Sequence, residues 1–286
     1  MKSLNAEVIT WFSENRRDLP WRSTDAWGVL VSEFMLQQTP VARVLPVWNA
    51  WMLRWPTPHA LAAATPAEVI TAWGRLGYPR RALRLYQSAK IIVADFAGSV
   101  PRSPRDLLAL PGVGEYTAAA ITAFAYEERS LVLDTNIRRL LARIIDGVEF
   151  PTPTATKSEK RSREALIPSE KAHVWAAATM ELGALICTAK NPRCQICPVK
   201  TQCKWSALGY PKSERISKRQ SWHGTDRQCR GKIVQALRES ISLTEGEIKK
   251  LWQEDSQVEK ALQTLEADGL IQIKTQSNSP AYSLPW

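Results

Sequence analysis

Four cysteines close together in the chain carry the clearest chemistry in this sequence. Cys187, Cys194, Cys197 and Cys203 follow the pattern C-x6-C-x2-C-x5-C, and no histidine stands between the first and the last. Thiolates in such a group bind zinc or an iron–sulfur cluster. Zinc sites more often contain two short cysteine pairs or a histidine, but these residues alone leave both metals open. Cys229 lies apart, and we expect it to be an ordinary packed or surface cysteine.

Two acidic residues stand beside apolar residues, where an unpaired carboxylate is costly to bury. Glu33 precedes Phe34-Met35-Leu36, and Asp134 follows Val132-Leu133. Such acids either cap helices and form salt bridges, or have pKa values tuned for proton transfer and charge stabilisation. Their spacing leaves both interpretations open.

A glycine-rich turn, Leu110-Pro111-Gly112-Val113-Gly114, lies between the two acids and precedes a helix expected from residue 116 to 126. Glycines permit close approach of the backbone, and a helix start offers N–H groups and a positive dipole end to a phosphate. By itself the pattern is equally typical of a simple tight turn.

The charge balance favours an anionic partner. The formal net charge is +10, and 44% of the residues are hydrophobic, which excludes a disordered chain. No apolar run approaches the roughly 18 residues of a membrane helix, and the first residues do not resemble a signal peptide. We therefore expect a cytoplasmic protein without a membrane partner. The basic excess lies in residues 1–232, because residues 233–286 hold more acidic than basic side chains.

The elements that must position these groups are helices. Thr65-Pro66-Ala67-Glu68 and Ser103-Pro104-Arg105-Asp106 each combine an N-cap residue, a proline at the first helical position and an acid at the third. Period-two patterns are absent before residue 270, so we predict that residues 1–208 are all-α.

A basic linker and a small terminal domain are expected next. Residues 209–228 are polar and basic, and residues 229–286 predict three helices followed by a terminal hairpin, a winged-helix-like arrangement. Capping boxes are expected at Thr244 and Ser256, and a helix is expected to begin near Arg230. The helix from Ser256 to Asp268 is acidic, so we expect it to dock on the first domain or on a protein partner rather than to enter a DNA groove.

Several motifs in order along residues 8–207 resemble the helix-hairpin-helix DNA glycosylase superfamily with a [4Fe-4S] cluster, and within it the MutY-type adenine DNA glycosylases. The resemblance is carried by the four cysteines, Asp134 and the following segments: Leu19-Pro20-Trp21-Arg22, residues 32–39, Leu76-Gly77-Tyr78, residues 110–117 and Met180-Glu181-Leu182-Gly183-Ala184.

The resemblance implies a two-domain helix-hairpin-helix glycosylase fold with an added winged-helix-like α+β domain. We expect a six-helix barrel that contains the hairpin at 24–134 and an iron–sulfur cluster domain made of 1–23 and 135–208. The linker at 209–228 and the winged-helix-like domain at 229–286 complete the chain.

The resemblance also implies the reaction, which is hydrolysis of the N-glycosidic bond of adenine flipped out from opposite 8-oxoguanine or guanine. Glu33, kept protonated by apolar surroundings, would protonate N7, and ionised Asp134 would stabilise the oxocarbenium-like sugar. Relatives that also cut the strand have a lysine where this chain has Tyr116, so the enzyme would be monofunctional.

Roles for further residues follow from the same resemblance. Tyr116 would bond to the acids, Asn136 would orient Asp134, and the four cysteines would hold the cluster. The remaining predicted contacts are the adenine pocket of Trp21, Arg22, Leu36 and Glu181, the wedge residues Gln38 and Tyr78, and the backbone-binding glycines Gly112 and Gly114.

The chain departs from the family pattern in three places. Pro79 replaces a second tyrosine, Thr135 replaces a glycine, and the larger domain that reads 8-oxoguanine in relatives has no counterpart, so the preference for 8-oxoguanine over guanine is left open. Trp222-His223-Gly224 would be either linker or a lesion contact. Alternatives are a thymine glycosylase for T opposite G and a non-catalytic DNA-binding iron–sulfur protein. We expect a nucleoid-associated monomer on double-stranded DNA.

Overall fold

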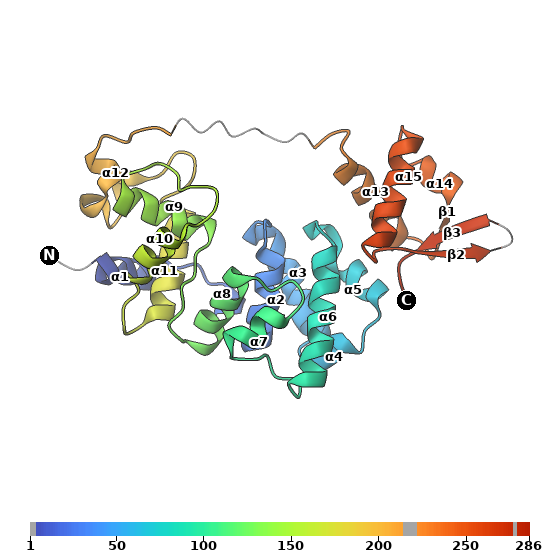
Figure 1. Ribbon diagram of the computed structural model, residues 1–286, viewed down its shortest axis with the longest axis horizontal. Helices are drawn as coiled ribbons and strands as arrows, with labels where there is room; N and C mark the ends of the chain where they lie inside the picture. Colours follow the sequence, from blue (N-terminus) through green and yellow to red (C-terminus); the bar gives the residue numbers. More distant parts are fainter. Residues whose placement is uncertain (1–3, 214–221, 277–278) are drawn as a thin grey trace. The chain divides into compact units, whose positions relative to one another are not determined.

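The computed structural model describes residues 4–213, 222–276 and 279–286, and the chain divides into two compact units (Figure 1). Unit 1 consists of Met1–Val29, Arg102–Leu108 and Val113–Ile216. Unit 2 consists of Leu30–Pro101, Ala109–Gly112 and Ser217–Trp286. The described residues before position 209 contain helices and no strand, as predicted.

Unit 1 is built around a core shared by four helices. Val8, Phe12, Ile137 and Leu182 are buried in this core, together with alanines that allow the helices to approach closely. The helices of unit 1 are α1 (Leu4–Asn15), α7 (Pro104–Ala109), α8 (Glu115–Tyr126), α9 (Thr135–Leu141), α10 (Lys157–Glu164), α11 (Ala172–Leu185) and α12 (Lys204–Ala207). Short helical turns lie at η1 (Pro20–Arg22), η3 (Ala142–Asp146), η4 (Cys194–Ile196) and η5 (Lys200–Gln202).

Unit 2 has a tryptophan-rich helical core. Trp51 packs edge-on against Trp55 and Trp73, with ring centroids 4.9 Å and 5.5 Å away, so these tryptophans pack helices together. The helices are α3 (Val41–Arg54), α4 (Pro58–Ala62), α5 (Pro66–Trp73), the turn η2 (Gly74–Leu76) and α6 (Arg80–Asp95). Helix α2 (Ala26–Leu36) begins in unit 1 and ends in unit 2.

Local capping explains where several helices begin. The Thr65 hydroxyl accepts a hydrogen bond from the Glu68 N–H at 3.2 Å, and the Glu68 carboxylate accepts one from the Thr65 N–H at 2.8 Å. This is the predicted capping box of α5, and α7 likewise begins at the predicted Pro104. The box predicted at Thr244 also forms and opens α14 (Glu245–Lys249).

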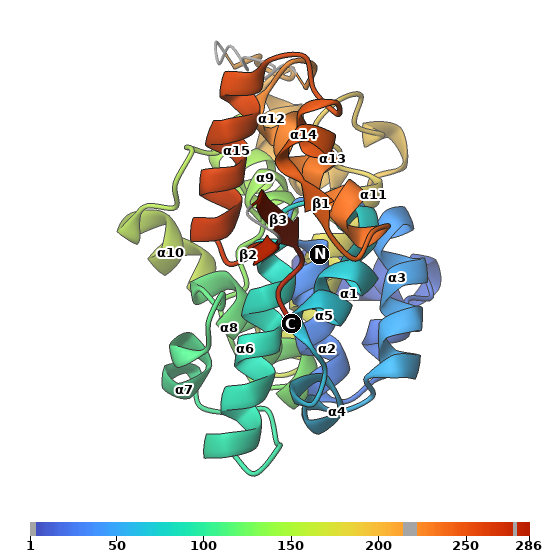
Figure 2. The ribbon, with the colours of Figure 1, turned by 90° about the vertical axis from the view of Figure 1, so that its right-hand side faces the viewer.

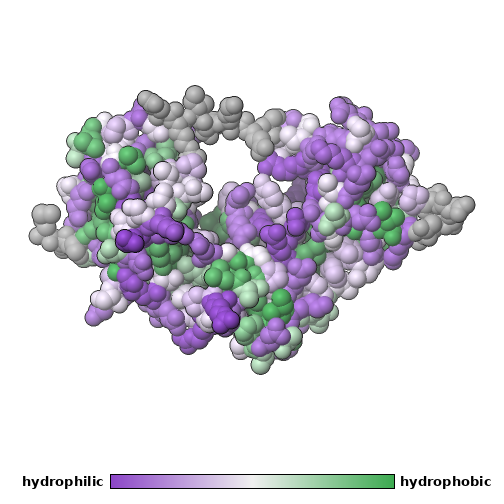
Figure 3. All heavy atoms as spheres, in the orientation of Figure 1, coloured by the Kyte–Doolittle hydropathy of each residue, from purple (hydrophilic) through white to green (hydrophobic). Residues whose placement is uncertain are grey.

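The terminal domain has the predicted helices and hairpin, with one additional short strand. Its further elements are α13 (Asp226–Arg238), β1 (Leu243–Thr244), α15 (Asp255–Ala267), β2 (Gln272–Gln276) and β3 (Ser279–Ser283). The antiparallel sheet has the order β1-β3-β2, and Ile273 stands opposite Tyr282. Figure 2 shows the sheet beside α14 and α15, and the upper part of this domain is largely hydrophilic in Figure 3.

Two predicted helix starts in this domain are wrong. Helix α15 begins at Asp255, two residues too early for Ser256 to cap it, and its N-cap residue is Glu254, whose side chain forms no capping hydrogen bond. Helix α13 begins four residues before Arg230, because the Thr225 hydroxyl caps it by accepting from the Gln228 N–H at 3.3 Å.

The terminal domain packs through α13 on helix α5 of unit 2. Ile70 of α5 is fully buried in the terminal core beside Val234 and Leu237. The Arg238 guanidinium donates to the Ile70 carbonyl at 3.1 Å. Cys229 is buried in the same core, so it is a packed cysteine. Among the described helices, none has the length and apolar character required to cross a membrane.

Candidate active site

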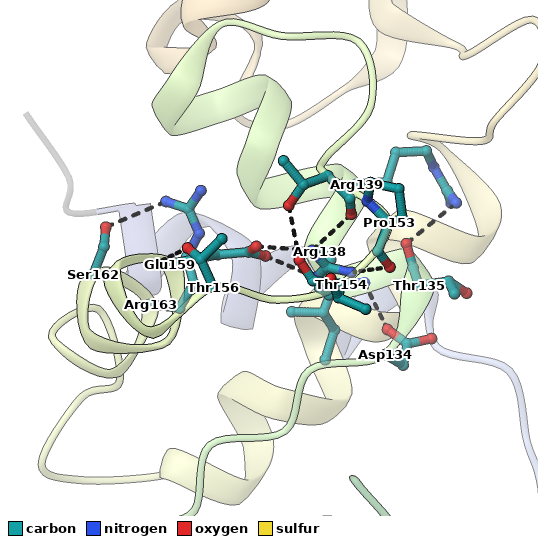
Figure 4. A network of polar contacts seen from close by, with 12 residues as sticks. Asp134, Thr135, Arg138, Arg139, Pro153, Thr154, Thr156, Glu159, Ser162 and Arg163 are labelled. Atoms are coloured by element: carbon teal, nitrogen blue, oxygen red, sulfur yellow. Dashed lines mark hydrogen bonds and ion pairs between the residues drawn. The ribbon is translucent and has the colours of Figure 1, made fainter. Parts of the chain in front are cut away.

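Asp134 is the N-cap residue of α9, and both of its carboxylate oxygens are held (Figure 4). One oxygen accepts a hydrogen bond from the Ile137 N–H at 2.6 Å, and the other accepts from the Asn136 amide at 2.7 Å. Burial raises the pKa of Asp134 above its ordinary value, whereas these hydrogen bonds and the charge of Arg139 act to lower it. Asp134 therefore caps a helix and is also a carboxylate with a shifted pKa.

The predicted orienting role of Asn136 has support from a buried arginine that sequence reasoning missed. The Arg139 guanidinium donates to the Asn136 side-chain oxygen at 2.9 Å and to the Gly183 and Cys187 carbonyl oxygens at 2.7 Å and 2.8 Å. A Cβ on Gly183 would stand 2.7 Å from the Asn136 carbonyl oxygen, so only glycine permits this approach of α11 to α9.

A second arginine joins α9 to α10 and to the loop that precedes it. Arg138 forms two hydrogen bonds to the Glu159 carboxylate, at 2.7 Å and 2.8 Å, and one to the Thr152 carbonyl at 2.9 Å (Figure 4). The Asp134 carboxylate thus stands on a helix with a fixed position in unit 1.

Glu181 is buried on α11 and fixes the N-terminal segment that carries Trp21. Its carboxylate accepts hydrogen bonds from the Arg17 backbone N–H at 2.9 Å and from the Arg17 guanidinium at 3.0 Å and 2.6 Å. The Arg22 guanidinium lies 2.9 Å away. Burial acts to raise the pKa of Glu181, but these two arginines bring it below its ordinary value. Glu181 is therefore an ionised anchor for this segment.

Tyr116 is the second residue of α8 and is partly buried against the core of unit 1. Ile137 and Leu140 of α9 belong to the same core, so α8 and α9 support Tyr116 and Asp134 through shared packing. Trp21 is 9% exposed and lies in the turn η1.

Glu33 lies near the end of α2 and is 5% exposed. Its neighbours Phe34 and Met35 are fully buried, as the apolar sequence suggested, and Leu36 is half-buried. The next residues leave the helix, and Gln38 is exposed with a positive φ of 54°. Tyr78 is also exposed and has a φ of 49°.

The glycine-rich turn has the local geometry that its sequence predicts. Gly112 has a φ of 86°, and a Cβ there would stand 2.8 Å from the Phe34 ring and 3.1 Å from Arg84. Gly114 is the N-cap residue of α8, has no side chain to cap the first N–H groups, and faces open space. Gly114 and the following Glu115 are both exposed.

The four cysteines line one small cavity together with Arg143 and Trp205. The Arg143 guanidinium is fully buried, donates to the Cys187 sulfur at 3.3 Å and lies 4.5 Å from the centroid of the Trp205 ring. Its second terminal nitrogen is buried without a hydrogen-bond partner among the described residues. A buried cation that donates to one of four thiols favours the ionised thiolate, which is the form that binds a metal centre.

The donor set fits an iron–sulfur cluster. Burial raises the pKa of Cys197 to about 11, and burial and the neighbouring cysteines raise the pKa of Cys194 and Cys203, so only a bound cationic centre would keep these sulfurs ionised. Among the described residues no three His, Cys, Asp or Glu side chains form a site for a single metal ion. Four cysteine thiols without a histidine are the ligand set typical of an iron–sulfur cluster.

The predicted site residues fall into two groups. Unit 1 contains Trp21, Arg22, Gly114, Tyr116, Asp134, Asn136, Glu181, Cys187, Cys194, Cys197 and Cys203, and unit 2 contains Glu33, Leu36, Gln38, Tyr78 and Gly112. Their assigned roles stay predictions. Sequence reasoning missed the half-exposed Arg17 and the buried Arg81, Arg139 and Arg143, which support these residues, because an arginine ordinarily indicates a solvated surface.

Comparison with known proteins gives two family matches. Residues 31–166 match the model of HhH-GPD superfamily base excision DNA repair proteins, and residues 187–203 match the iron-sulfur binding domain of endonuclease III. The second match spans all four cysteines, which confirms the prediction of a [4Fe-4S] cluster and leaves zinc unsupported.

Relatives match nearly the whole chain. An adenine DNA glycosylase of Mycolicibacterium smegmatis is 47% identical over 93% of this chain and 92% of its own length. One of Mycobacterium tuberculosis is 44% identical over 98% of this chain and 93% of its own length. A solved structure of a thermostable thymine-DNA glycosylase is similar with a TM-score of 0.66 and 26% identity, covering 71% of this chain and 95% of that chain.

Proposed function

Because the chain belongs to the adenine DNA glycosylase family of the helix-hairpin-helix superfamily, we propose that it hydrolyses the N-glycosidic bond of adenine paired with 8-oxoguanine or guanine. The products would be free adenine and an abasic site in double-stranded DNA. The observation that carries this proposal is the Asp134 carboxylate, fixed through both oxygens at the start of a braced helix. Such a preorganised anion is suited to a sugar that becomes cationic.

The proposed mechanism assigns different roles to the two carboxyl groups. Neutral adenine is a poor leaving group, so Glu33 donates a proton to N7 before the bond from C1′ to N9 breaks. The bonding electrons leave with the base, and the Asp134 carboxylate stabilises the positive charge on the sugar. Water then adds its hydroxide to C1′ and releases a proton. Tyr116 has no amine to form a Schiff base, so the strand remains intact.

The remaining site residues bind and orient. In the proposal Trp21, Arg22, Leu36 and Glu181 surround the flipped adenine, and Gly112 and Gly114 hold the DNA backbone. The four cysteines would hold the [4Fe-4S] cluster as deprotonated thiolates, and the bound cluster would cross-link residues 187–203. We also propose that the protein works as a monomer at the nucleoid, which light scattering and cell fractionation can test.

Single-turnover cleavage tests the function directly. Duplexes with A opposite 8-oxoguanine, A opposite guanine and T opposite guanine are incubated with excess protein and then heated in alkali to cut abasic sites. We expect cleavage of the two adenine duplexes. Cleavage of the T duplex alone would identify a thymine glycosylase, and cutting without alkali would refute the monofunctional mechanism.

A variant separates catalysis from folding. Glu33→Gln should abolish excision while duplex binding is retained, and the matched Glu14→Gln change in an exposed residue of α1 should leave both intact. If Glu33→Gln protein still excises adenine at the wild-type rate, Glu33 is not the proton donor. If the wild-type protein binds all three duplexes but cuts none of them, the non-catalytic alternative holds.

A further inference from the structure

Two exposed loop tips in unit 2 have a backbone conformation that their side chains disfavour. Gln38 and Tyr78 have φ values of 54° and 49°, in the left-handed region where residues other than glycine are uncommon. Holding such a conformation costs on the order of 1–2 kcal/mol at each residue. It persists only where surrounding contacts enforce it, and such contacts concentrate at functional sites.

A single buried side chain supplies these contacts. Arg81 of α6 is 6% exposed, and its guanidinium donates to the carbonyl oxygens of Phe34 at 2.8 Å, Met35 at 3.2 Å and Gln37 at 2.6 Å. These carbonyl groups belong to the last turn of α2 and its exit, where the helix has no N–H partners of its own to offer. The cation also suits the negative end of the helix dipole.

The same guanidinium holds the second loop. It donates to the Gly77 carbonyl at 3.0 Å and the Leu76 carbonyl at 3.4 Å, immediately before Tyr78. It also donates to the Thr39 hydroxyl at 3.1 Å, and that hydroxyl lies 3.2 Å from the Leu76 carbonyl oxygen. Arg81 therefore joins the residue before Gln38 and the residue before Tyr78 through one planar group.

Tyr78 itself is held from two sides. The Arg81 guanidinium lies 5.8 Å from the centroid of its ring, and the Arg227 guanidinium donates to its hydroxyl at 3.0 Å. Arg227 lies in turn 4.7 Å from the centroid of the exposed Trp222 ring. The aromatic ring and the Gln38 amide are thus presented to solvent on two loops with little freedom to move apart.

We propose that Arg81 is a positioning residue that fixes Gln38 and Tyr78 as one rigid two-pronged wedge, which enters the base stack and drives adenine out of the duplex. This inference rests on the proposed adenine glycosylase function. A wedge must disrupt base stacking, which costs a few kcal/mol per step. A loop that moved instead of holding its position would not separate the stacked bases. The guanidinium fork is required, because its two terminal nitrogens make more contacts to the two loops than the three donors of a single ammonium group can replace.

The test compares substrates that differ in how strongly adenine is stacked. In the first duplex A stands opposite 8-oxoguanine and is flanked by matched base pairs. In the second duplex the same lesion pair is flanked by two mismatched base pairs on each side, so that extrusion of adenine costs less. Single-turnover rates are measured for the wild type, Arg81→Lys and Arg80→Lys. Arg80 lies on the same helix, is exposed and pairs with Asp268 at 3.1 Å, so it serves as the matched control.

We expect Arg81→Lys to lower the rate about tenfold or more on the matched duplex and less than about threefold on the mismatched one, since tenfold corresponds to about 1.4 kcal/mol of barrier. A 2-aminopurine beside the target adenine should show slower unstacking in the variant. Arg80→Lys should match the wild type on both duplexes. Equal losses of Arg81→Lys on both duplexes, or no loss on either, would overturn the wedge proposal.

A second variant covers the case in which Arg81→Lys fails to fold. Thr39→Val removes one acceptor of the guanidinium and keeps the shape of the side chain, so it should show a smaller loss, about threefold, confined to the matched duplex. A wild-type protein that cuts neither adenine duplex would refute the proposed function itself, whereas wild-type activity with substrate-independent losses in the variants refutes only the wedge.

Discussion

The burial of the Glu181 carboxylate allows us to predict how much its substitution lowers the free energy of unfolding. Its side chain is 2% exposed, and those of Arg17 and Arg22 are 35% and 24% exposed. Glu181→Gln keeps the shape but removes the charge that both guanidinium groups face. Breaking a fully buried ion pair costs about 3–5 kcal/mol, and because both arginines can recover some hydration, we expect a loss of about 2–3 kcal/mol. Thermal unfolding should then occur roughly 5–10 °C lower.

The matched control is Glu128→Gln. Glu128 pairs with Arg102 at 2.8 Å, but these side chains are 46% and 66% exposed, so the same substitution should cost less than about 1 kcal/mol. Both variants and the wild type are followed by tryptophan fluorescence during heating, with the cluster kept under anaerobic conditions. Equal shifts in Tm for the two variants would refute the role of Glu181 as a buried anchor.

The pH dependence gives an independent check of the same reasoning. The pKa of Glu181 is lower in the folded protein than its ordinary value of 4.5, so its stabilising contribution is complete above that pH and is lost as the pH falls through the folded-state pKa. The difference in Tm between wild type and Glu181→Gln should therefore be constant from pH 7 to pH 5 and shrink below pH 4.5. A difference in Tm that is unchanged at pH 3.5 would contradict the conclusion that Glu181 is ionised in the folded protein.

Three further predictions follow from other contacts. Asp134→Asn keeps an oxygen that can accept from the Ile137 N–H, so Tm should change by less than about 2 °C while the single-turnover rate falls by about 100-fold or more; a large Tm loss would show a mainly structural role. Because burial raises the pKa of Asp134, the acid limb of the wild-type rate profile should lie at higher pH than an ordinary aspartate gives, and a limb below pH 3.8 would contradict this. Thr65→Ala should lower stability by about 1 kcal/mol through loss of the α5 capping box, and an unchanged urea midpoint would refute that value.

Features encoded by neighbouring residues were predictable from the sequence. The capping boxes at Thr65 and Thr244 formed as expected, because the N-cap and the acid three positions later meet within one turn. The four cysteines were recognisable as a metal centre for the same reason. Glu254 shows the limit of this reasoning, since it is the N-cap residue of α15 two positions before Ser256, where a similar pattern predicted the cap.

Contacts between distant segments were not predictable. Arg17 and Glu181 are separated by 164 positions, and Arg81 reaches back 47 positions to Phe34. No periodic pattern distinguishes Arg81, which folds inward from the amphipathic helix α6, from an arginine that remains in solvent on the same helix, such as Arg80. The family resemblance named the polar residues proposed to face DNA but not these buried arginines that hold them in place.

The burial of Ile70 beneath α13 limits how this chain can be recombined with its relatives. A Leu or Val at position 70 would change the packing of a domain encoded more than 150 residues later, and the Arg238 hydrogen bond depends on the path of the α5 backbone. A chimaera that exchanges only the terminal domain would therefore expose an apolar helix surface and lose a buried hydrogen bond. In this family, α5 and α13 should therefore be transferred together when domains are exchanged.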